Sequence, residues 1–318
     1  MQDPVAIERE VLTTVAPATS EPEPEIAARQ LSQAQLTWIR FRRHKPAMIG
    51  SVIVIVMILL AVFAPYITGE NPYNPATYDA TNQDLSPRLA PHWWFILGTD
   101  TYGHTMLSQI LWGARISLMV GFLASFGATI IGVVVGAISG YYGRWVDTVM
   151  MRVTDVFLTL PFLPLLILAA DIWGQGHVGL IIIVFIIFSW PIVARLTRSS
   201  YLRLREQEFT EAARSVGVSD MRIVFRHLLP NALRPVLVQT TLNIASFIVV
   251  EAAIDFLGAG VKYPDTSWGN ILADAENSFS GGNWWWATFP GIFLVLTVLS
   301  VNFVGDGLGD ALDVRSKV

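Results

Sequence analysis

Long apolar segments separated by polar loops set the pattern of this chain of 318 residues. About 20 apolar residues in a helix, at a rise of about 1.5 Å each, cross the roughly 30 Å hydrocarbon core of a bilayer. Six segments approach that length, which predicts an all-α integral membrane protein with six transmembrane helices. The predicted spans are residues 47–67, 116–139, 149–170, 180–194, 236–257 and 288–304.

The apolar pattern also divides the chain. Residues 1–34 are rich in Glu, Pro, Ala and Thr and have little to bury, so we expect a disordered N-terminal tail. No basic start with a short apolar core precedes the first span, which is therefore predicted to be an uncleaved anchor. Residues 35–114 hold that span and an exterior segment, 115–310 a core of five spans, and 311–318 a short tail.

The basic residues predict the orientation of the spans. With the N-terminus inside, only Arg88, Arg115 and Lys262 of the 21 Lys and Arg residues lie outside. Positive residues concentrate in cytoplasmic loops, so both termini are predicted to be cytoplasmic.

Composition excludes several classes of function. Hydrophobic residues make up 53% of the chain and charged residues 14%, too apolar a balance for a soluble domain. Cysteine is absent, which rules out disulfides and thiolate sites, and the five histidines are scattered, so we expect no metal site. The net charge of −4, with no basic stripe, argues against nucleic acid. No P-loop, HExxH or GxSxG motif occurs, and we expect no enzyme and no cofactor bound by this chain.

A polar segment that reads EAARSVGVSDMRIVFRHLLP interrupts the apolar pattern between two predicted spans. Thr210 can cap a short helix, and Gly217 supplies the left-handed residue that ends it. Ser219 and Asp220 can cap a second helix, which Pro230 is expected to stop. The pattern indicates a compact helix-turn-helix knob, although an ordinary amphipathic connector would have similar local features.

The order of residues in this segment resembles the cytoplasmic loop of permease subunits in bacterial ATP-binding-cassette importers. The matching order is EAA, three residues, Gly217, nine residues, then His227, any residue, Leu and Pro. His227 departs from the Ile that is frequent there. In that family the loop, about 199–230 here, docks into a cleft of the ATPase subunit. The resemblance implies coupling roles for Glu211, Ala212, Ala213, Gly217, Ser219, Asp220, Leu229 and Pro230.

Three further stretches are similar to the C-type permease of dipeptide and oligopeptide importers. They are LGTDTYGHTMLSQILWGARISLMVG, FLGAGVKYPDTSWGNIL and WWWATFPGIFLVLTVLSVNFVGDGLGDALDVR. That family usually has Arg, Asp and Arg where this chain has His104, Thr105 and Gln109. We therefore do not expect the salt bridges that are typical of the family at these positions.

This resemblance implies a type I importer permease fold in a bacterial or archaeal inner membrane. The implied partners are a second homologous permease, two ATPase subunits that carry ATP and Mg²⁺, and an external substrate-binding protein. Peptides are the leading substrate, with nickel chelates and glutathione as alternatives. A secondary transporter or channel, or a membrane-anchored assembly protein without transport, remains the rival from another class.

Breaks and polar residues within the spans are candidates for the translocation path. Pro161 and Pro164 in the third span and Pro191 in the fourth remove backbone hydrogen bonds, so they can kink helices with or without a role in gating. Asn243 can bind another helix or the substrate.

Acidic residues within spans are the other candidates. Glu251 and Asp255 lie four residues apart on one helical face, and the cost of burying acids in a membrane predicts that they face protein or water. They can line the exterior mouth and attract the amino group of a peptide, or pair with Arg115 or another subunit. At the inner end of the third span, Asp147, Arg152 and Asp155 are expected to form a local charge network, with Arg152 and Asp155 at i,i+3 spacing.

Overall fold

The computed structural model describes residues 32–69, 90–91, 96–100, 102–173, 176–276 and 281–313. The predictions for most of the N-terminal tail, for residues 70–89 of the exterior segment and for 314–318 lie outside the described residues. The chain divides into two units, Met1–Leu36 and Thr37–Val318. Helix α2, Gln33–Arg43, overlaps the last two residues of the predicted tail, and every later element belongs to the second unit.

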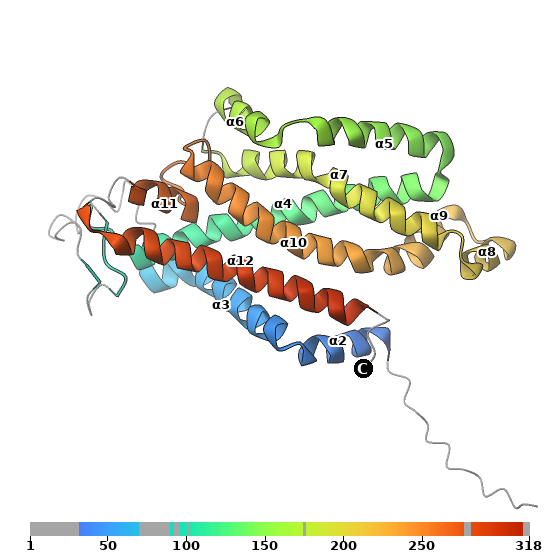
Figure 1. Cartoon of the computed structure of the whole chain (residues 1–318), viewed down its shortest axis with the longest axis horizontal. Coiled ribbons are helices and arrows are strands. Elements are labelled where there is room, and N and C mark those ends of the chain that lie inside the picture. Colours follow the sequence, from blue (N-terminus) through green and yellow to red (C-terminus); the bar gives the residue numbers. More distant parts are fainter. Residues whose placement is uncertain are drawn as a thin grey trace, which may run out of the picture. The chain divides into compact units, whose positions relative to one another are not determined.

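Every regular element in the described part of the chain is a helix, as predicted (Figure 1). Five uninterrupted helical stretches there are long and apolar enough to cross a membrane, and a bent helix pair supplies a sixth crossing if it counts as one span. The five stretches are α3, Lys45–Thr68; α4, Met106–Tyr142; α7, Val178–Leu204; Asp220–Phe256, which joins α9, η1 and α10; and α12, Trp284–Leu312.

The third predicted span is wrong as one continuous helix. Helix α5, Arg144–Thr159, and helix α6, Phe162–Trp173, meet at an angle of 77°. A proline disfavours the helical conformation of the residue before it, and Leu160, which precedes Pro161, is extended with φ −76° and ψ 130°. Pro164 lies in the first turn of α6, where its missing N–H would have had no partner within the helix. Pro191 lies inside α7 and leaves that helix continuous.

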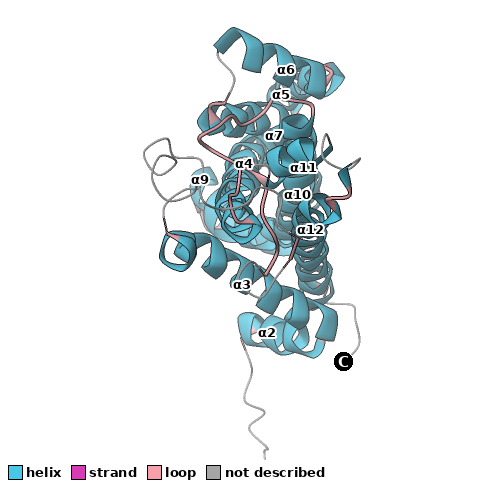
Figure 2. Cartoon of the chain, turned by 90° about the vertical axis from the view of Figure 1, so that its left-hand side faces the viewer, coloured by secondary structure: helices cyan, strands magenta, loops and turns pink. Residues whose placement is uncertain are grey.

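Helix α4 lies in the middle of the second unit, with α7, α10, α12 and α3 around it (Figure 2). Glycines on α4 allow α7 to approach closely. A Cβ at Gly132 would lie 2.6 Å from the Cβ of Val193, and a Cβ at Gly140 would lie 2.6 Å from the Cβ of Tyr201. Small residues at such crossings are a common device of membrane helices, because they let two backbones pack without large side chains between them.

Charged side chains join α5 to α7. Asp147 binds Arg198 through both carboxylate oxygens, with 2.5 Å between Oδ2 and Nη2, and Asp155 lies 2.5 Å from Nη2 of Arg195. The predicted pairing of Asp155 with Arg152 on the same helix is therefore wrong. The partner comes from the neighbouring helix, which sequence spacing along α5 does not reveal.

The second unit has two distinct ends. Helices α8, Glu208–Ser215, and α9, Asp220–Arg222, lie at one end, here called the knob end. Helix α11, Trp268–Glu276, and residues 96–100 and 102–105 lie at the other, here called the loop end (Figure 1). At the loop end Trp268 is fully buried and donates its indole N–H to the carbonyl of Ile110 at 3.1 Å. This contact fixes α11 on α4.

Candidate functional site

The predicted helix-turn-helix is present as residues 207–222, here called the knob. Helix α8 ends at Ser215, and Gly217 follows with φ +75°. The N–H of Gly217 binds the carbonyl of Arg214 at 2.9 Å, and the N–H of Val218 binds that of Ala213 at 3.1 Å. These bonds satisfy carbonyls that the helix end would otherwise leave open, so the left-handed glycine performs the predicted termination.

Two predicted details of the knob are wrong, and a third is confirmed only in position. Thr210 is not the cap of α8, since Gln207 precedes the helix and the Thr210 hydroxyl donates to the Leu204 carbonyl at 2.9 Å. Ser219 stands at the cap position of α9 with an extended backbone, but its side chain makes no capping bond. Pro230 stops no helix.

The helix continues through Pro230 because a π-helical turn precedes this residue. This turn, η1, Ile223–Leu228, leads directly into α10, Leu229–Phe256. The Leu229 N–H binds the Val224 carbonyl five residues back, which is the π pattern. Pro230 then falls in the first turn of α10, where a helix tolerates proline. The motion of the knob and that of α10 are thus linked through continuous helical backbone.

Polar contacts anchor the knob to two other helices. The hydroxyl of Tyr141, near the end of α4, donates to Asp220 at 2.5 Å, and the Arg214 guanidinium lies 5.3 Å from the centre of the Tyr141 ring. From α7, the Tyr201 hydroxyl donates to the Val224 carbonyl at 3.0 Å. Tyr141 and Tyr201 were not predicted as functional residues, because each contacts a residue that is distant in sequence.

An apolar cluster lies beneath these polar contacts. It joins residues of α4, α7, the knob, η1 and α10, so a movement of the knob relative to these helices would expose apolar surface. Its buried members are Ala137, Tyr141, Tyr201, Ala213, Ile223, Val224, Leu228 and Ala232.

The outer surface of the knob end carries exposed apolar side chains. Val216 is 79% exposed, Met221 60% and Phe225 43%. The two alanines of the EAA motif face differently, since Ala212 is exposed and Ala213 is buried. Exposed apolar groups of this kind are typical of protein interaction surfaces. The remaining predicted coupling residues are exposed except Leu229, which is half-buried: Glu211, Gly217, Ser219, Asp220 and Pro230.

The acidic pair on α10 is buried inside the chain. Glu251 is 0% and Asp255 2% exposed. The Ser117 hydroxyl of α4 donates to Glu251 at 3.0 Å, while Asp255 accepts the Val261 N–H at 2.7 Å and the Ser267 hydroxyl. Neither acid forms an ion pair with Arg115 of α4 within the described residues. The pair holds α10 against α4 and against the loop that leads to α11.

The candidate Asn243 is also buried, at 8% exposure. Its side-chain oxygen accepts a hydrogen bond of 2.9 Å from Gln239, one turn away on the same helix. The partner of the Asn243 side-chain oxygen therefore lies on the same helix and not, as expected, on another one.

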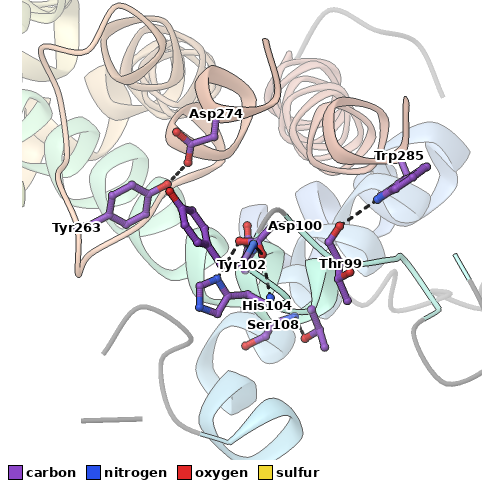
Figure 3. A network of polar contacts seen from close by, with 10 residues as sticks. Thr99, Asp100, Tyr102, His104, Ser108, Tyr263, Asp274 and Trp285 are labelled. Carbon is purple, nitrogen blue, oxygen red and sulfur yellow. Dashed lines mark hydrogen bonds and ion pairs between the residues drawn. The ribbon is translucent and has the colours of Figure 1, made fainter. Parts of the chain in front are cut away.

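A compact polar network lies at the loop end, and Figure 3 shows it. Asp100 is 2% exposed and accepts the N–H groups of Tyr102 and His104, each at 2.8 Å. The Asp100 Oδ2 atom lies 2.8 Å from Nδ1 of His104 and accepts a 2.8 Å bond from Gln109. His104 and Gln109, two of the three departures from the family pattern, are therefore both partners of one buried acid. Asp100 was not predicted as a functional residue, because its only signal in the sequence is its place shortly before these residues.

A second acid of this network has a shifted pKa. Burial raises the pKa of Asp274, the Tyr263 hydroxyl that binds its carboxylate lowers it, and the nearby Asp100 raises it further. The indole N–H of Trp285 donates to the Thr99 carbonyl at 3.2 Å and ties the start of α12 to the same loop (Figure 3). Within the described part of the chain, no group of three or more His, Cys, Asp or Glu residues could hold a metal ion.

Two family models match the sequence. Residues 132–318 match "Binding-protein-dependent transport system inner membrane component", and residues 32–91 match "N-terminal TM domain of oligopeptide transport permease C".

Curated relatives cover almost the whole chain. The dipeptide transport system permease protein DppC of Alkalihalophilus pseudofirmus is 38% identical over 95% of this chain and 97% of its own. DppC of Bacillus subtilis is 36% identical over 90% of this chain and 87% of its own. Among solved structures, an inward-facing MetNI methionine ABC transporter matches with a TM-score of 0.53 and 23% identity, over 65% of this chain and 98% of that chain. At that identity the match shows the fold alone.

Proposed function

Because the chain belongs to the family of binding-protein-dependent transport system inner membrane components, we propose that it is the permease subunit of an ATP-driven importer of dipeptides or oligopeptides. The observation that carries the proposal is the knob, an exposed helix-turn-helix fixed to several spans by hydrogen bonds and a buried apolar cluster. The peptide substrate is supported by relatives of 36% to 38% identity that are named as dipeptide permeases.

The complete importer contains further chains. This permease forms half of the path, and a second homologous permease forms the other half. Two ATPase subunits bind ATP and Mg²⁺ and hydrolyse the nucleotide, and an external binding protein delivers the peptide. The sequence of this chain contains no P-loop, which supports the assignment of hydrolysis to its partners.

In this assembly the knob end faces the cytoplasm. Arg203, Arg214, Arg222 and Arg226 lie in or beside the knob, whereas Arg115 and Lys262 belong to the other side. The excess of basic residues on the cytoplasmic side of membrane proteins supports this orientation. Both termini of the chain are then cytoplasmic.

In this mechanism the knob transmits the movement of the ATPase subunits to the spans. When the ATPase subunits close or separate, they displace the exposed face of the knob. The knob cannot move alone, because Tyr141 links it to α4, Tyr201 links η1 to α7, and η1 continues into α10. Displacement therefore tilts three helices together and opens the path to alternate sides, as rigid-body transitions do when their interfaces are tightly packed.

ATPase activity of the complete complex in lipid nanodiscs tests this function. We expect binding protein loaded with a mixed peptide pool to stimulate hydrolysis, and Glu211→Arg on the knob to abolish the stimulation. Glu206→Arg, at an exposed acid just outside the knob, is the matched control and should leave stimulation near the wild-type level. Stimulation by a nickel chelate or by glutathione, and not by peptide, would identify that compound as the substrate. If no ATPase copurifies and the chain alone moves solute down a gradient, the chain is a secondary transporter.

A further inference from the structure

A cavity of about 710 Å³ opens on the side of the chain between α3 and α4, toward the loop end. Ile58 and Ala61 line it from the second half of α3, Phe122 and Leu123 from the first half of α4, and Val178 from the start of α7. Its volume is in the range of about 300–1,000 Å³ that is common for small-molecule sites. The mostly apolar wall suits a ligand with apolar side groups.

Side chains of opposite charge line this apolar cavity. Arg115 and Asp265 both line it, and both side chains are exposed. Within the described residues, neither forms an ion pair. The Arg115 guanidinium lies over the Trp112 ring, 4.7 Å from its centre, which orients the arginine and leaves its N–H groups for a ligand.

Two more polar groups of the lining lack partners. The indole N–H of Trp112 and the hydroxyl of Thr266 are buried atoms with no hydrogen-bond partner among the described residues. Thr266 as a whole is 1% exposed. Buried polar atoms without partners are costly, but both atoms are closed off from solvent, so a ligand in the cavity can reach them only after these side chains turn toward it.

We propose that this cavity is a peptide subsite of the permease, in which Arg115 binds the terminal carboxylate of a short peptide and Asp265 binds its terminal ammonium group. The proposal rests on the proposed import of peptides and names the chemistry that this chain recognises. Arginine matches a carboxylate in charge and in planar geometry. Trp112 and Thr266 belong to the same wall, and peptide amides can bind their unpaired N–H and hydroxyl groups once these side chains turn toward the cavity.

The charges favour a zwitterion over an anionic lipid. An anionic lipid headgroup would gain from Arg115 but would be repelled by Asp265, which lines the same cavity. A peptide with both termini free carries a charge for each residue. A peptide with a blocked terminus would leave one charge unmatched, so the subsite prefers unblocked peptides.

Uptake by the complete complex in proteoliposomes tests the subsite. A dipeptide is supplied as the free acid and as the C-terminal amide, each on saturating binding protein, and the rate of each variant is divided by the wild-type rate for the same peptide. The binding protein is unchanged, so its own preference cancels from this ratio. Because a hydrogen bond to a charged group contributes enough for about a tenfold effect or more, Arg115→Gln should lower uptake of the free acid by about that factor. It should leave uptake of the amide nearly unchanged.

Further variants separate recognition from structure. Arg115→Lys keeps the positive charge and should retain most of the preference for the free acid. Asp265→Asn should slow the peptide with a free amino group and spare its N-acetylated form. Lys262→Gln, which removes an exposed charge that donates to the Gly258 carbonyl outside this cavity, is the matched control and should affect all peptides equally.

Three outcomes would overturn the subsite. Equal losses for the free acid and the amide in Arg115→Gln would assign Arg115 a structural role. A loss that follows the fraction of anionic or of ammonium-bearing zwitterionic lipid in the vesicles, whatever the peptide terminus, would assign the cavity to a lipid. In both cases wild-type peptide uptake persists and the proposed function stands. Absence of wild-type uptake of any peptide would instead remove the proposed function, and the subsite with it.

Discussion

The hydroxyl of Tyr141, the last residue but one of α4, donates a 2.5 Å hydrogen bond to the carboxylate of Asp220, the first residue of α9. The two residues are 79 positions apart in the sequence. Tyr141 is 5% exposed and belongs to the apolar cluster beneath the knob, so its ring and its hydroxyl both restrain the same element. This bond links the knob directly to the central helix, beside the contact of the Arg214 guanidinium with the Tyr141 ring.

Tyr141→Phe should therefore weaken coupling without unfolding the protein. The phenyl ring keeps the apolar contacts and only the hydrogen bond is lost, at a cost of about 1 kcal/mol. We expect the number of peptides imported per ATP hydrolysed to fall. Tyr142→Phe at the neighbouring, exposed tyrosine is the control. An unchanged ratio in Tyr141→Phe would mean that the apolar cluster alone transmits the movement.

Gly217→Val should impair the function of the knob, because valine does not readily adopt the backbone conformation of Gly217. A Cβ at Gly217 would meet nothing within 4 Å, so a clash is not the reason. The reason is its φ of +75°, which costs non-glycine residues about 1–2 kcal/mol, and β-branched residues more. Asn tolerates this region, so Gly217→Asn should retain much of the stimulated ATPase activity that Gly217→Val loses. Equal activity of the two variants would contradict this account.

The close approach of α4 and α7 yields a prediction on stability. In Gly132→Ala the new methyl group would lie 2.6 Å from the Cβ of Val193, closer than real Cβ atoms come, so the helices must shift. Overpacking of this kind costs about 1–3 kcal/mol. We expect a lower midpoint of thermal unfolding in detergent. Gly179→Ala on α7, where nothing lies within 4 Å of the new methyl group, should leave the midpoint close to the wild-type value.

Local signals along the chain predicted much of this fold. The apolar runs predicted the spans, because a helix that crosses a bilayer needs apolar side chains along its length. Gly217 predicted the turn of the knob, because the left-handed conformation depends on that one residue. The bend between α5 and α6 also follows a local rule, since Pro161 acts on the residue before it.

Contacts between distant segments could not be predicted in this way. Spacing on α5 suggested Arg152 for Asp155, but Arg195 of α7 is the partner. Pro230 indicated a helix end, yet the preceding π turn lets the helix continue. Glu251 and Asp255 were expected at a solvent-lined mouth or beside an arginine, and serines of α4 and of the α11 loop bind them instead. Each outcome depends on which helix packs alongside, which spacing within one segment does not contain.

The acid in α11 predicts a pH dependence at the loop end. The pKa of Asp274 is raised in the folded state, mainly by burial, so between its ordinary value of 3.8 and the raised value the folded state binds more protons than the unfolded one. Stability of the loop end should then fall as the pH rises through that window. Hydrogen exchange of α11 amides, corrected for the intrinsic effect of pH, should show this slope in the wild type and lose it in Asp274→Asn. Glu276→Gln, at an exposed acid of the same helix, should keep the slope.

Asp100 should control the order of the loop before α4. Its Oδ1 atom accepts the amides of Tyr102 and His104, and its Oδ2 atom accepts the side chain of Gln109. Asp100→Ala removes the acceptor of both amides, and each buried group left unpaired costs about 1–3 kcal/mol. We expect the Tyr102 and His104 amides to exchange at least about tenfold faster, because tenfold corresponds to about 1.4 kcal/mol. Gln109→Ala removes only the Gln109 bond to Oδ2 and should leave both amides protected. Equally fast exchange in the two variants would show that the order of the loop depends on the whole network and not on the two amide bonds.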